Sequence, residues 1–294
     1  MNNNLKNLVK KFIEKSKNLN VCIIGETIID QFIFVNHQGT SMKSNCPALK
    51  LTSEFEKQTG GSSVIANHIK DFVNNLNLIT NNKEEIVKTR YLEKFGGKKH
   101  VEINKFETNN FKKFSVNPSD YDLVIVADFG HSFCDKLTIS DNFYLMCQTN
   151  SANFGFNRVS KWKHYKKINV CVDKREASLQ LNKNVDFNDI NSVKELYDYE
   201  LNCSNLIVTL GENGALFFDG KNHVQCKSFK TNVIDTIGAG DTFYIFSCIA
   251  THIGFDPEEI LQISSLAASI STTWLGNKEY ITKEKLTHYE NRII

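Results

Sequence analysis

Apolar positions along the chain follow two spacings, one typical of amphipathic helices and one typical of buried strands. Helical spacing is found at residues 3–17, just after Gly60-Gly61, at 240–253 and from Asp256-Pro257 onward. Uninterrupted runs rich in Val and Ile, typical of parallel strands covered on both faces, occupy residues 21–25, 122–129, 143–147, 168–173 and 205–210. Strands that alternate with helices predict an α/β fold with a mostly parallel central sheet.

Three regions depart from this alternation. From Asp30 to about Glu56, two extended runs flank a polar tract, which predicts a small β element outside the main sheet. Residues 215–229 predict a hairpin that turns at Asp219-Gly220. Between the strand-like residues 76–80 and Lys88, only residues 81–87 remain, too few for a crossover to a parallel strand. We therefore expect a sheet shortened at this point.

Composition narrows the class of protein. The chain has 294 residues, of which 41% are apolar, enough for one large α/β domain with an appendage. Its net charge of +2 argues against a protein that binds nucleic acid phosphate. The eight cysteines show no zinc-like spacing, and no run has the length of a membrane span or the character of a signal peptide. We expect a cytoplasmic protein with reduced thiols, and neither nucleic acid nor membrane as a partner.

The segment from Asp235 to Thr242 is the strongest indication of chemistry. Gly238-Ala239-Gly240 precedes a predicted helix, so the backbone can approach a ligand, and free amides of the first helical turn suit a phosphate. Asp241 would repel such an anion unless it serves as a base that takes a proton from an attacking hydroxyl. An ordinary aspartate that stabilises the helix dipole is the alternative.

Two common nucleotide-binding designs are excluded. The first strand is followed by Glu26-Thr27 rather than by the glycine pattern of a dinucleotide fold, and the chain has no G-x-x-x-x-G-K-[ST] loop.

The segment Asp235-Thr236-x-Gly238-Ala239-Gly240-Asp241 resembles the C-terminal signature of the ribokinase-like (PfkB) carbohydrate kinases at every fixed position. Gly25-x-x-x-x-Asp30, Gly60-Gly61, Asp173-x-x-Glu176 and Thr209-Leu210-Gly211-x-x-Gly214 extend the resemblance over most of the chain. It implies a ribokinase-like domain over residues 1–294, with a small β lid formed by segments 31–58 and 88–107. It also implies an ATP-dependent transfer of a phosphoryl group to a sugar hydroxyl.

The resemblance assigns roles to individual residues. Asp241 is the expected base, and the amides of Gly238, Ala239 and Gly240 are the expected anion hole. Asp30, Gly60, Gly61 and Asn67 are expected at the sugar, and Glu176 is expected to organise Mg²⁺ through water. The residues expected at the nucleotide are Thr209, Gly211, Gly214, Thr236 and Ala268. A monovalent cation, required by some relatives, stays an open question.

Within the family, three stretches look most like heptose-type kinases, including the kinase half of bifunctional heptose kinase/nucleotidyltransferases. They are Lys88-Thr89-Arg90-Tyr91, Asp128-Phe129-Gly130-His131 and residues 148–157, from Gln148-Thr149-Asn150-Ser151 to Asn153-Phe154-Gly155-Phe156-Asn157. A heptose phosphate is therefore the first expectation for the substrate, with ribose, fructose or a nucleoside as alternatives. The chain ends about where a kinase half ends, so no nucleotidyltransferase domain is expected. A homodimer through the lid is expected because a small sheet leaves exposed strand edges.

Several interpretations remain open on the residues alone. Asp30 could cap a turn, Glu176 could be a solvated helix-start carboxylate, and His131 could line the pocket or lie in a plain loop. Lys88, Arg90, Lys98 and Lys99 could hold a sugar phosphate or form a solvated face. The asparagine that often follows the glycine pair is replaced by Val64, which puts the contact expected from Asn67 in question. A sugar- or nucleotide-binding protein without catalysis is the alternative function.

Overall fold

The computed structural model describes residues 3–82, 86–106, 111–150, 153, 155–166, 168–201 and 203–293. Residues 83–85 of the short bridge, residue 107 of the second predicted lid segment, and Ser151 and Phe154 lie outside these ranges. Among the described residues, eight strands form a large sheet in the order β14-β13-β12-β11-β10-β8-β1-β4. The six strands from β12 to β4 are parallel, whereas β13 and β14 form an antiparallel hairpin at the other edge.

The strands of the large sheet are β1 (Asn20–Gly25), β4 (Asn75–Ile79), β8 (Leu123–Asp128), β10 (Tyr144–Cys147), β11 (Asn169–Asp173), β12 (Asn205–Thr209), β13 (Ala215–Phe218) and β14 (His223–Cys226). The α-helices are α1 (Asn3–Ser16), α2 (Ser62–Ile69), α3 (Lys174–Leu181), α4 (Ile190–Glu195), α5 (Ala239–His252), α6 (Pro257–Ser271) and α7 (Lys283–Thr287). The short strands β7 (Phe114–Val116) and β9 (Leu137–Ile139) pair with each other outside the large sheet.

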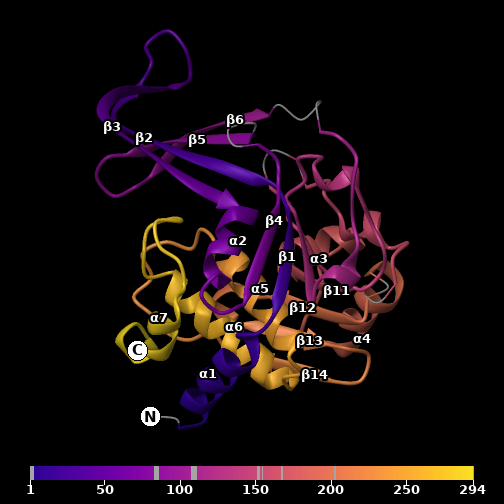
Figure 1. The fold of residues 1–294 in the computed structure, drawn as a ribbon. Helices are drawn as coiled ribbons and strands as arrows, with labels where there is room; N and C mark the ends of the chain where they lie inside the picture. The colour runs from indigo at the N-terminus through magenta and orange to yellow at the C-terminus, as the bar shows by residue number, and fades with distance from the viewer. Residues whose placement is uncertain are drawn as a thin grey trace.

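Side chains alternate between two cores, one on each face of the large sheet. Ile23 and Ile125 face the core that also contains α1, α2, α5 and α6. Ile24 and Val126, their sequence neighbours, face the core on the side of α3 and α4. Figure 1 shows these helices packed around the sheet, with both chain ends at the side opposite the second sheet. Because both faces are covered, the strands read as continuous apolar runs.

A second sheet stands over the carboxyl-terminal ends of the central strands, and its β2–β3 hairpin projects away from the body (Figure 1). It contains β2 (Thr27–Thr40), β3 (Pro47–Gly61), β5 (Ile86–Glu93) and β6 (Lys99–Phe106), in the order β3-β2-β5-β6. β4 forms the edge of the large sheet, and the next strand, β5, pairs with β2 instead of returning to the large sheet. The expected shortening of the sheet near residues 81–87 is thus observed, since the strand that follows β4 in the sequence belongs to the second sheet.

The predicted elements agree closely with this fold. The helix predicted from Asp256-Pro257 onward begins with a capping box formed by Asp256 and Glu259. The hairpin turns at the predicted Asp219-Gly220. Helix α5 ends at His252, and Gly254 follows with a φ of 74°, the left-handed conformation that glycine favours. The strands β7 and β9 were not predicted, because three residues are too short for a periodic signal. Within the described ranges, no helix combines the length and the apolar character that a membrane span requires.

Candidate active site

A cavity of about 270 Å³ lies between the large sheet and the second sheet. The ends of β11 and β12, the loop after β10, the first turn of α5 and the inward face of β5 and β6 form its walls. The lining residues are Lys88, Arg90, Glu102, Met146, Gln148, Thr149, Asn150, Cys171, Val172, Asp173, Glu176, Thr209, Gly240 and Asp241. Because ligands of open α/β sheets bind at the carboxyl ends of the strands, this cavity is the candidate active site.

Asp241 lies in the first turn of α5 and is only 9% exposed. Its Oδ1 is buried and has no hydrogen-bond partner among the described residues. Burial, together with the negative charge of Asp30, raises the pKa of Asp241 from 3.8 to about 7, and the charge of Lys88 opposes this rise. A carboxylate with an unpartnered oxygen and a pKa near neutrality can accept a proton inside the cavity.

The turn before Asp241 presents backbone amides to the cavity. Gly238 has a φ of 79°, and a Cβ there would lie 2.8 Å from Oδ1 of Asn277, so both conformation and space require glycine. A Cβ at Gly240 would meet nothing within 4 Å, since Gly240 borders the open cavity. Ala239 donates its amide to the Thr236 oxygen at 3.3 Å, whereas the amides of Gly238 and Gly240 have no hydrogen bond in the described ranges. The amide of Gly240 is therefore available to a ligand.

Asp30 lies on β2 with its carboxylate held between the two sheets. The guanidinium of Arg90 donates to Oδ1 of Asp30, and its Nε donates to Glu102 at 3.0 Å. A Cβ at Gly60 would lie 2.6 Å from Oδ2 of Asp30, which explains the need for glycine on the paired strand. In this structure the Asp30 carboxylate thus forms an ion pair with an arginine of the second sheet, and it is not exposed at a turn.

Lys88 is 5% exposed and points into the cavity from β5. Burial lowers the pKa of Lys88, and the nearby charges of Asp30, Glu102 and Asp241 partly oppose this. Among the residues described, no carboxylate pairs with it within 4.0 Å. The interpretation as a solvated face is therefore wrong for Lys88, which is buried, and for Arg90, which is half-buried and paired with carboxylates. It holds for the exposed Lys98 and Lys99.

Glu176 is 8% exposed, so it is not a solvated helix-start carboxylate. Its Oε2 accepts the amide of Asp173 in a capping box, and its Oε1 accepts the amide of Thr149, both at 2.8 Å. Burial, with the charge of Asp173, raises the pKa of Glu176 to about 8. Glu176 thus fixes the loop after β10 to the start of α3 at the cavity wall.

The other predicted residues are distributed around this cavity. Thr209 lines it, and Gly211 and Gly214, with φ values of 64° and 90°, form the turn that follows β12. Gly61 has a φ of 63° and its Cβ would lie 2.2 Å from the Glu26 oxygen. Of the residues predicted for the site, those among the described lining residues are Glu176, Thr209, Gly240 and Asp241. Outside the lining, Asn67 on α2 and Ala268 on α6 are half-buried, and Thr236 before α5 is exposed.

Glu26 is a residue that sequence reasoning used only to exclude a dinucleotide fold. Its carboxylate is fully buried after β1 and accepts the amides of Phe129, His131 and Phe133 at 2.8, 3.3 and 3.2 Å. Burial and the charge of Asp128 raise the pKa of Glu26 to about 7. Glu26 thereby fixes the loop that carries His131, whose buried ring packs on Phe106. The sequence feature that could have pointed to Glu26 is a charged residue directly after a buried strand.

Asn277 was missed because nothing in its sequence surroundings marks it. Its Nδ2 lies 3.4 Å from Oδ2 of Asp30, and its amide donates to Oε1 of Gln58 at 2.5 Å. Lys278, the next residue, pairs with Glu56 at 2.8 Å. The loop after α6 therefore connects the second sheet to the turn at Gly238.

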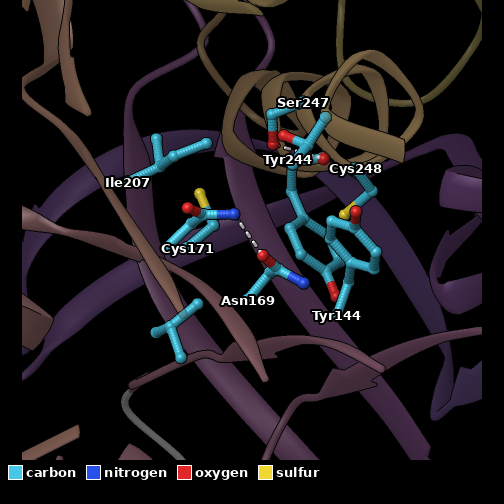
Figure 2. Close-up of a pocket in the computed structure, with 10 residues that line it drawn as sticks. Tyr144, Asn169, Cys171, Ile207, Tyr244, Ser247 and Cys248 are labelled. Carbon is cyan, nitrogen blue, oxygen red and sulfur yellow. Dashed lines mark hydrogen bonds between the residues drawn. The ribbon is translucent and has the colours of Figure 1, made fainter. Parts of the chain in front are cut away.

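Two other polar features carry no site. Glu26, Asp128 and Cys134 lie close enough to hold a metal ion, but the Glu26 oxygens accept amides and Asp128 pairs with Lys161 at 2.6 Å. A cavity of about 10 Å³ lies between α5 and the strands β10 to β12, lined by Tyr144, Asn169 and Tyr244 among others (Figure 2). That volume holds a water molecule at most.

The model of the pfkB family of carbohydrate kinases matches residues 169–282, which include Asp173, Glu176 and Asp241. Deoxyribokinase of Salmonella typhi is 35% identical over 101 residues, a stretch that covers 33% of this chain and 32% of that protein. The bifunctional protein HldE of Campylobacter fetus is 22% identical over 94% of this chain and 69% of its own length. The chain thus aligns with about a third of the deoxyribokinase it matches.

Solved structures share the fold over nearly the whole chain. Ribokinase of Thermotoga maritima has a TM-score of 0.67 at 17% identity and covers 93% of this chain and 99% of its own. Arabidopsis thaliana ribokinase, solved with ribose and ATP, has a TM-score of 0.67 at 13% identity, over 92% of this chain and 98% of its own. The ribokinase-like fold and the resemblance expected from the sequence are confirmed.

Proposed function

We propose that this chain, which has the ribokinase-like fold and matches the pfkB carbohydrate kinase family, transfers a phosphoryl group from ATP to a hydroxyl of a sugar or sugar phosphate. The observation that carries the proposal is Asp241, buried in the cavity with Oδ1 unpartnered. Relatives and solved neighbours, a deoxyribokinase and a ribokinase among them, support the same class of reaction.

The chemistry of the chain's own groups centres on the first turn of α5. Asp241 takes the proton of the acceptor hydroxyl at its free Oδ1, because a pKa near 7 keeps much of the carboxylate ionised at neutral pH. The Gly240 amide faces the same cavity and stabilises charge on an adjacent oxyanion. Gly238 and Ala239 hold this turn in shape.

Polar groups that line the cavity, among them Thr209, Glu176 and the Gly240 amide, support ATP and Mg²⁺ as its proposed ligands. When bound, ATP would supply the phosphoryl group and Mg²⁺ would neutralise its oxygens. The residues proposed to hold the nucleotide are Thr209, Gly211, Gly214, Thr236 and Ala268. Glu176 lines the cavity with both oxygens committed to amides, which suits a contact to Mg²⁺ through water rather than direct ligation. A requirement for a monovalent cation is tested by comparing turnover in potassium and sodium salts.

A substrate that carries an anionic group suits the lid side of the cavity. Lys88 is a buried cation without a carboxylate partner among the described residues, and Arg90 is near it. A phosphate would complete the coordination of Lys88. We therefore place a heptose phosphate first among the acceptors, ahead of neutral sugars, and Asp30, Gly60 and Gly61 at its hydroxyl groups. Asn67 is also proposed to contact the sugar, although it is not among the described residues that line the cavity.

The second sheet is proposed as a lid over the sugar and as the dimer surface. Arg90 and Glu102 line the cavity, so the next register row, Ile33-Phe55-Tyr91-Val101, faces away from it. Phe55 is 64% exposed and Ile103, on the same outward face, is 53% exposed. A second copy that covers this face would bury the apolar row and the edges of β3 and β6.

The test measures ADP formation with Mg-ATP and a panel of acceptors: heptose phosphates, ribose, fructose and nucleosides. We expect Asp241→Asn to bind ATP normally and to lose turnover by roughly 10²–10⁴-fold, the usual contribution of a general base. For the wild type, kcat/KM should fall as the pH drops below about 7, since protonated Asp241 cannot accept a proton.

The same experiment distinguishes the alternative, a sugar- or nucleotide-binding protein without catalysis. Its structural support is the contact of Arg90 with Asp30, which occupies a group proposed for the sugar. Binding of ATP or a sugar, seen as a thermal shift without ADP formation on any acceptor, would establish this alternative. Near-normal turnover of Asp241→Asn would remove Asp241 from the mechanism.

A further inference from the structure

His68 lies on α2 and is only 2% exposed, remote in sequence from the turn that carries Asp241. Its Nδ1 lies 3.0 Å from the amide nitrogen of Ile281, and its Nε2 lies 3.0 Å from Oγ1 of Thr242. Oγ1 of Thr242 in turn lies 2.9 Å from the Gly238 oxygen. Three hydrogen bonds thus connect the segment after α6 to the glycine turn at the start of α5.

The two ends of this chain of hydrogen bonds fix the position of every proton in it. The Ile281 amide can only donate, so Nδ1 of His68 accepts and carries no proton. The neutral ring then carries its proton on Nε2 and donates to Thr242. The Thr242 hydroxyl accepts a hydrogen bond from His68 and donates its single proton to the Gly238 oxygen, which can only accept.

The Gly238 oxygen receives a second donor, the Thr242 amide, at 2.9 Å. Because the peptide unit is planar, fixing the Gly238 oxygen also fixes the direction of the Ala239 amide. Asp241 and Gly240 belong to the same turn, between Gly238 and Thr242. A shift of this peptide would therefore move both the base and the free amide of Gly240.

We propose that His68 is a positioning residue for the phosphoryl-transfer site, which holds the Gly238–Ala239 peptide through Thr242 as the neutral, Nε2-protonated tautomer. The inference rests on the proposed function, since it assigns a catalytic purpose to the turn. The series of hydrogen bonds from Ile281 through His68 and Thr242 to Gly238, here called the relay, involves only groups of this chain. It can therefore be measured without a substrate.

The electrostatic surroundings agree with a permanently neutral ring. Burial, together with the positive charge of Lys285, lowers the pKa of His68 to about 3. A cationic ring would also direct a second donor at the Ile281 amide.

Nuclear magnetic resonance of the full chain labelled with ¹⁵N-histidine tests the tautomer. The His68 signals, assigned by their loss in His68→Gln, should show an unprotonated Nδ1 and a protonated Nε2 at pH 7.5. A protonated Nδ1, or averaging between the two tautomers, would overturn the relay.

Two substitutions separate positioning from packing. The amide nitrogen of glutamine reaches the place of Nε2, so His68→Gln keeps a donor to Thr242. The amide oxygen of asparagine takes the place of Nδ1, so His68→Asn keeps only the acceptor for Ile281. On the acceptor that gives the highest wild-type turnover, we expect kcat within about 3-fold of wild type for His68→Gln. His68→Asn should lose roughly 10- to 100-fold in kcat, with the KM for ATP nearly unchanged.

Thr242→Val and Thr242→Ser provide the matched pair at the next group of the relay. The valine variant should reproduce the loss of His68→Asn, and the double variant should add little to it, whereas the serine variant should retain turnover. In each variant, the loss in kcat is compared with the drop in the midpoint of thermal unfolding. If the two are proportional in all variants, the residues have a packing role only and the proposal is overturned.

A readout without turnover separates this proposal from the proposed function. The backbone amide signals of Ala239 and Gly240 should shift in His68→Asn and Thr242→Val, and stay close to wild type in His68→Gln and Thr242→Ser. If the wild type forms no ADP on any acceptor, the proposed function fails while these signals still decide whether His68 holds the turn. Unshifted signals in all four variants would overturn the relay.

Discussion

Burial of the Asp241 carboxylate costs free energy of folding. The carboxylate is buried, one oxygen lacks a partner in the described ranges, and Asp30 adds a second negative charge nearby. A carboxylate in such surroundings lowers the stability of the folded state whenever it is ionised. A proton acceptor requires such a buried, unpaired carboxylate. An aspartate with a purely structural role would be paired instead.

Replacing Asp241 should therefore stabilise the protein in a pH-dependent way. The pKa of Asp241 rises from 3.8 to about 7 on folding, so the penalty is absent below pH 4, grows between pH 4 and 7, and is complete above pH 7. We expect Asp241→Asn to gain roughly 2–4 kcal/mol in the free energy of unfolding at pH 8, and clearly less at pH 5. Urea unfolding at both pH values measures this.

The matched control is Asp71→Asn, at an exposed aspartate, which should leave the free energy of unfolding unchanged at both pH values. An equal gain at pH 5 and pH 8 in Asp241→Asn would contradict the raised pKa.

At the scale of elements, the loop after β8 depends on a residue from the end of another strand. Glu26 accepts three amides of this loop, from Phe129, His131 and Phe133. The loop has little hydrogen bonding of its own at these amides, so a carboxylate between β1 and β2 substitutes for a regular turn. His131, and through its ring Phe106 of the second sheet, takes its position from this arrangement.

Removing that carboxylate should destabilise the protein. Glu26→Ala leaves three buried amides without acceptors, which we expect to cost roughly 3–5 kcal/mol in the free energy of unfolding. Chemical unfolding measures the loss, and hydrogen exchange should show faster exchange at residues 129–133. Glu26→Gln, which retains one carbonyl oxygen, should lose less than the alanine variant. A Glu26→Ala protein as stable as wild type would show that the loop is held by other contacts.

At the scale of the whole molecule, the second sheet has one face toward the cavity and one face without a partner in the described chain. The outward row contains Ile33, Phe55, Tyr91 and Val101, and Ile103 lies beside it. Exposed apolar rows on a small sheet are typical of interaction surfaces. In the sequence, β2 follows β1 and β5 follows β4, so the second sheet is formed by segments that lie between strands of the large sheet.

We expect the wild type to be a dimer in solution and Phe55→Lys/Ile103→Lys to be a monomer, because buried lysines on both copies would repel each other. Size-exclusion chromatography with light scattering over a range of concentrations measures the mass. Ile190→Lys, at a residue that is 46% exposed on α4, is the control and should remain dimeric. A monomeric wild type at every concentration would refute the dimer.

Local patterns predicted most of the elements because their causes are local. The β1 run, the capping box at Asp256 and Glu259, and the hairpin at Asp219-Gly220 each follow from neighbouring residues. The glycine turn before Asp241 was predictable for the same reason, since its φ and its helix start are properties of a few adjacent positions. The sheet order was not predicted, because it depends on which strands pair over long separations.

The sequence by itself determined an α/β fold with a separate small sheet, the position of a phosphate-type turn and the acid beside it. Only the tertiary structure decided how these groups meet. Arg90 reaches Asp30 across 60 residues, Thr242 reaches His68 across 174, and Asn277 reaches Asp30 across 247. The absence of a partner for Oδ1 of Asp241 among the described residues likewise depends on every neighbour packed around it. Such contacts arise from the packing of distant segments, which no local pattern of residues encodes.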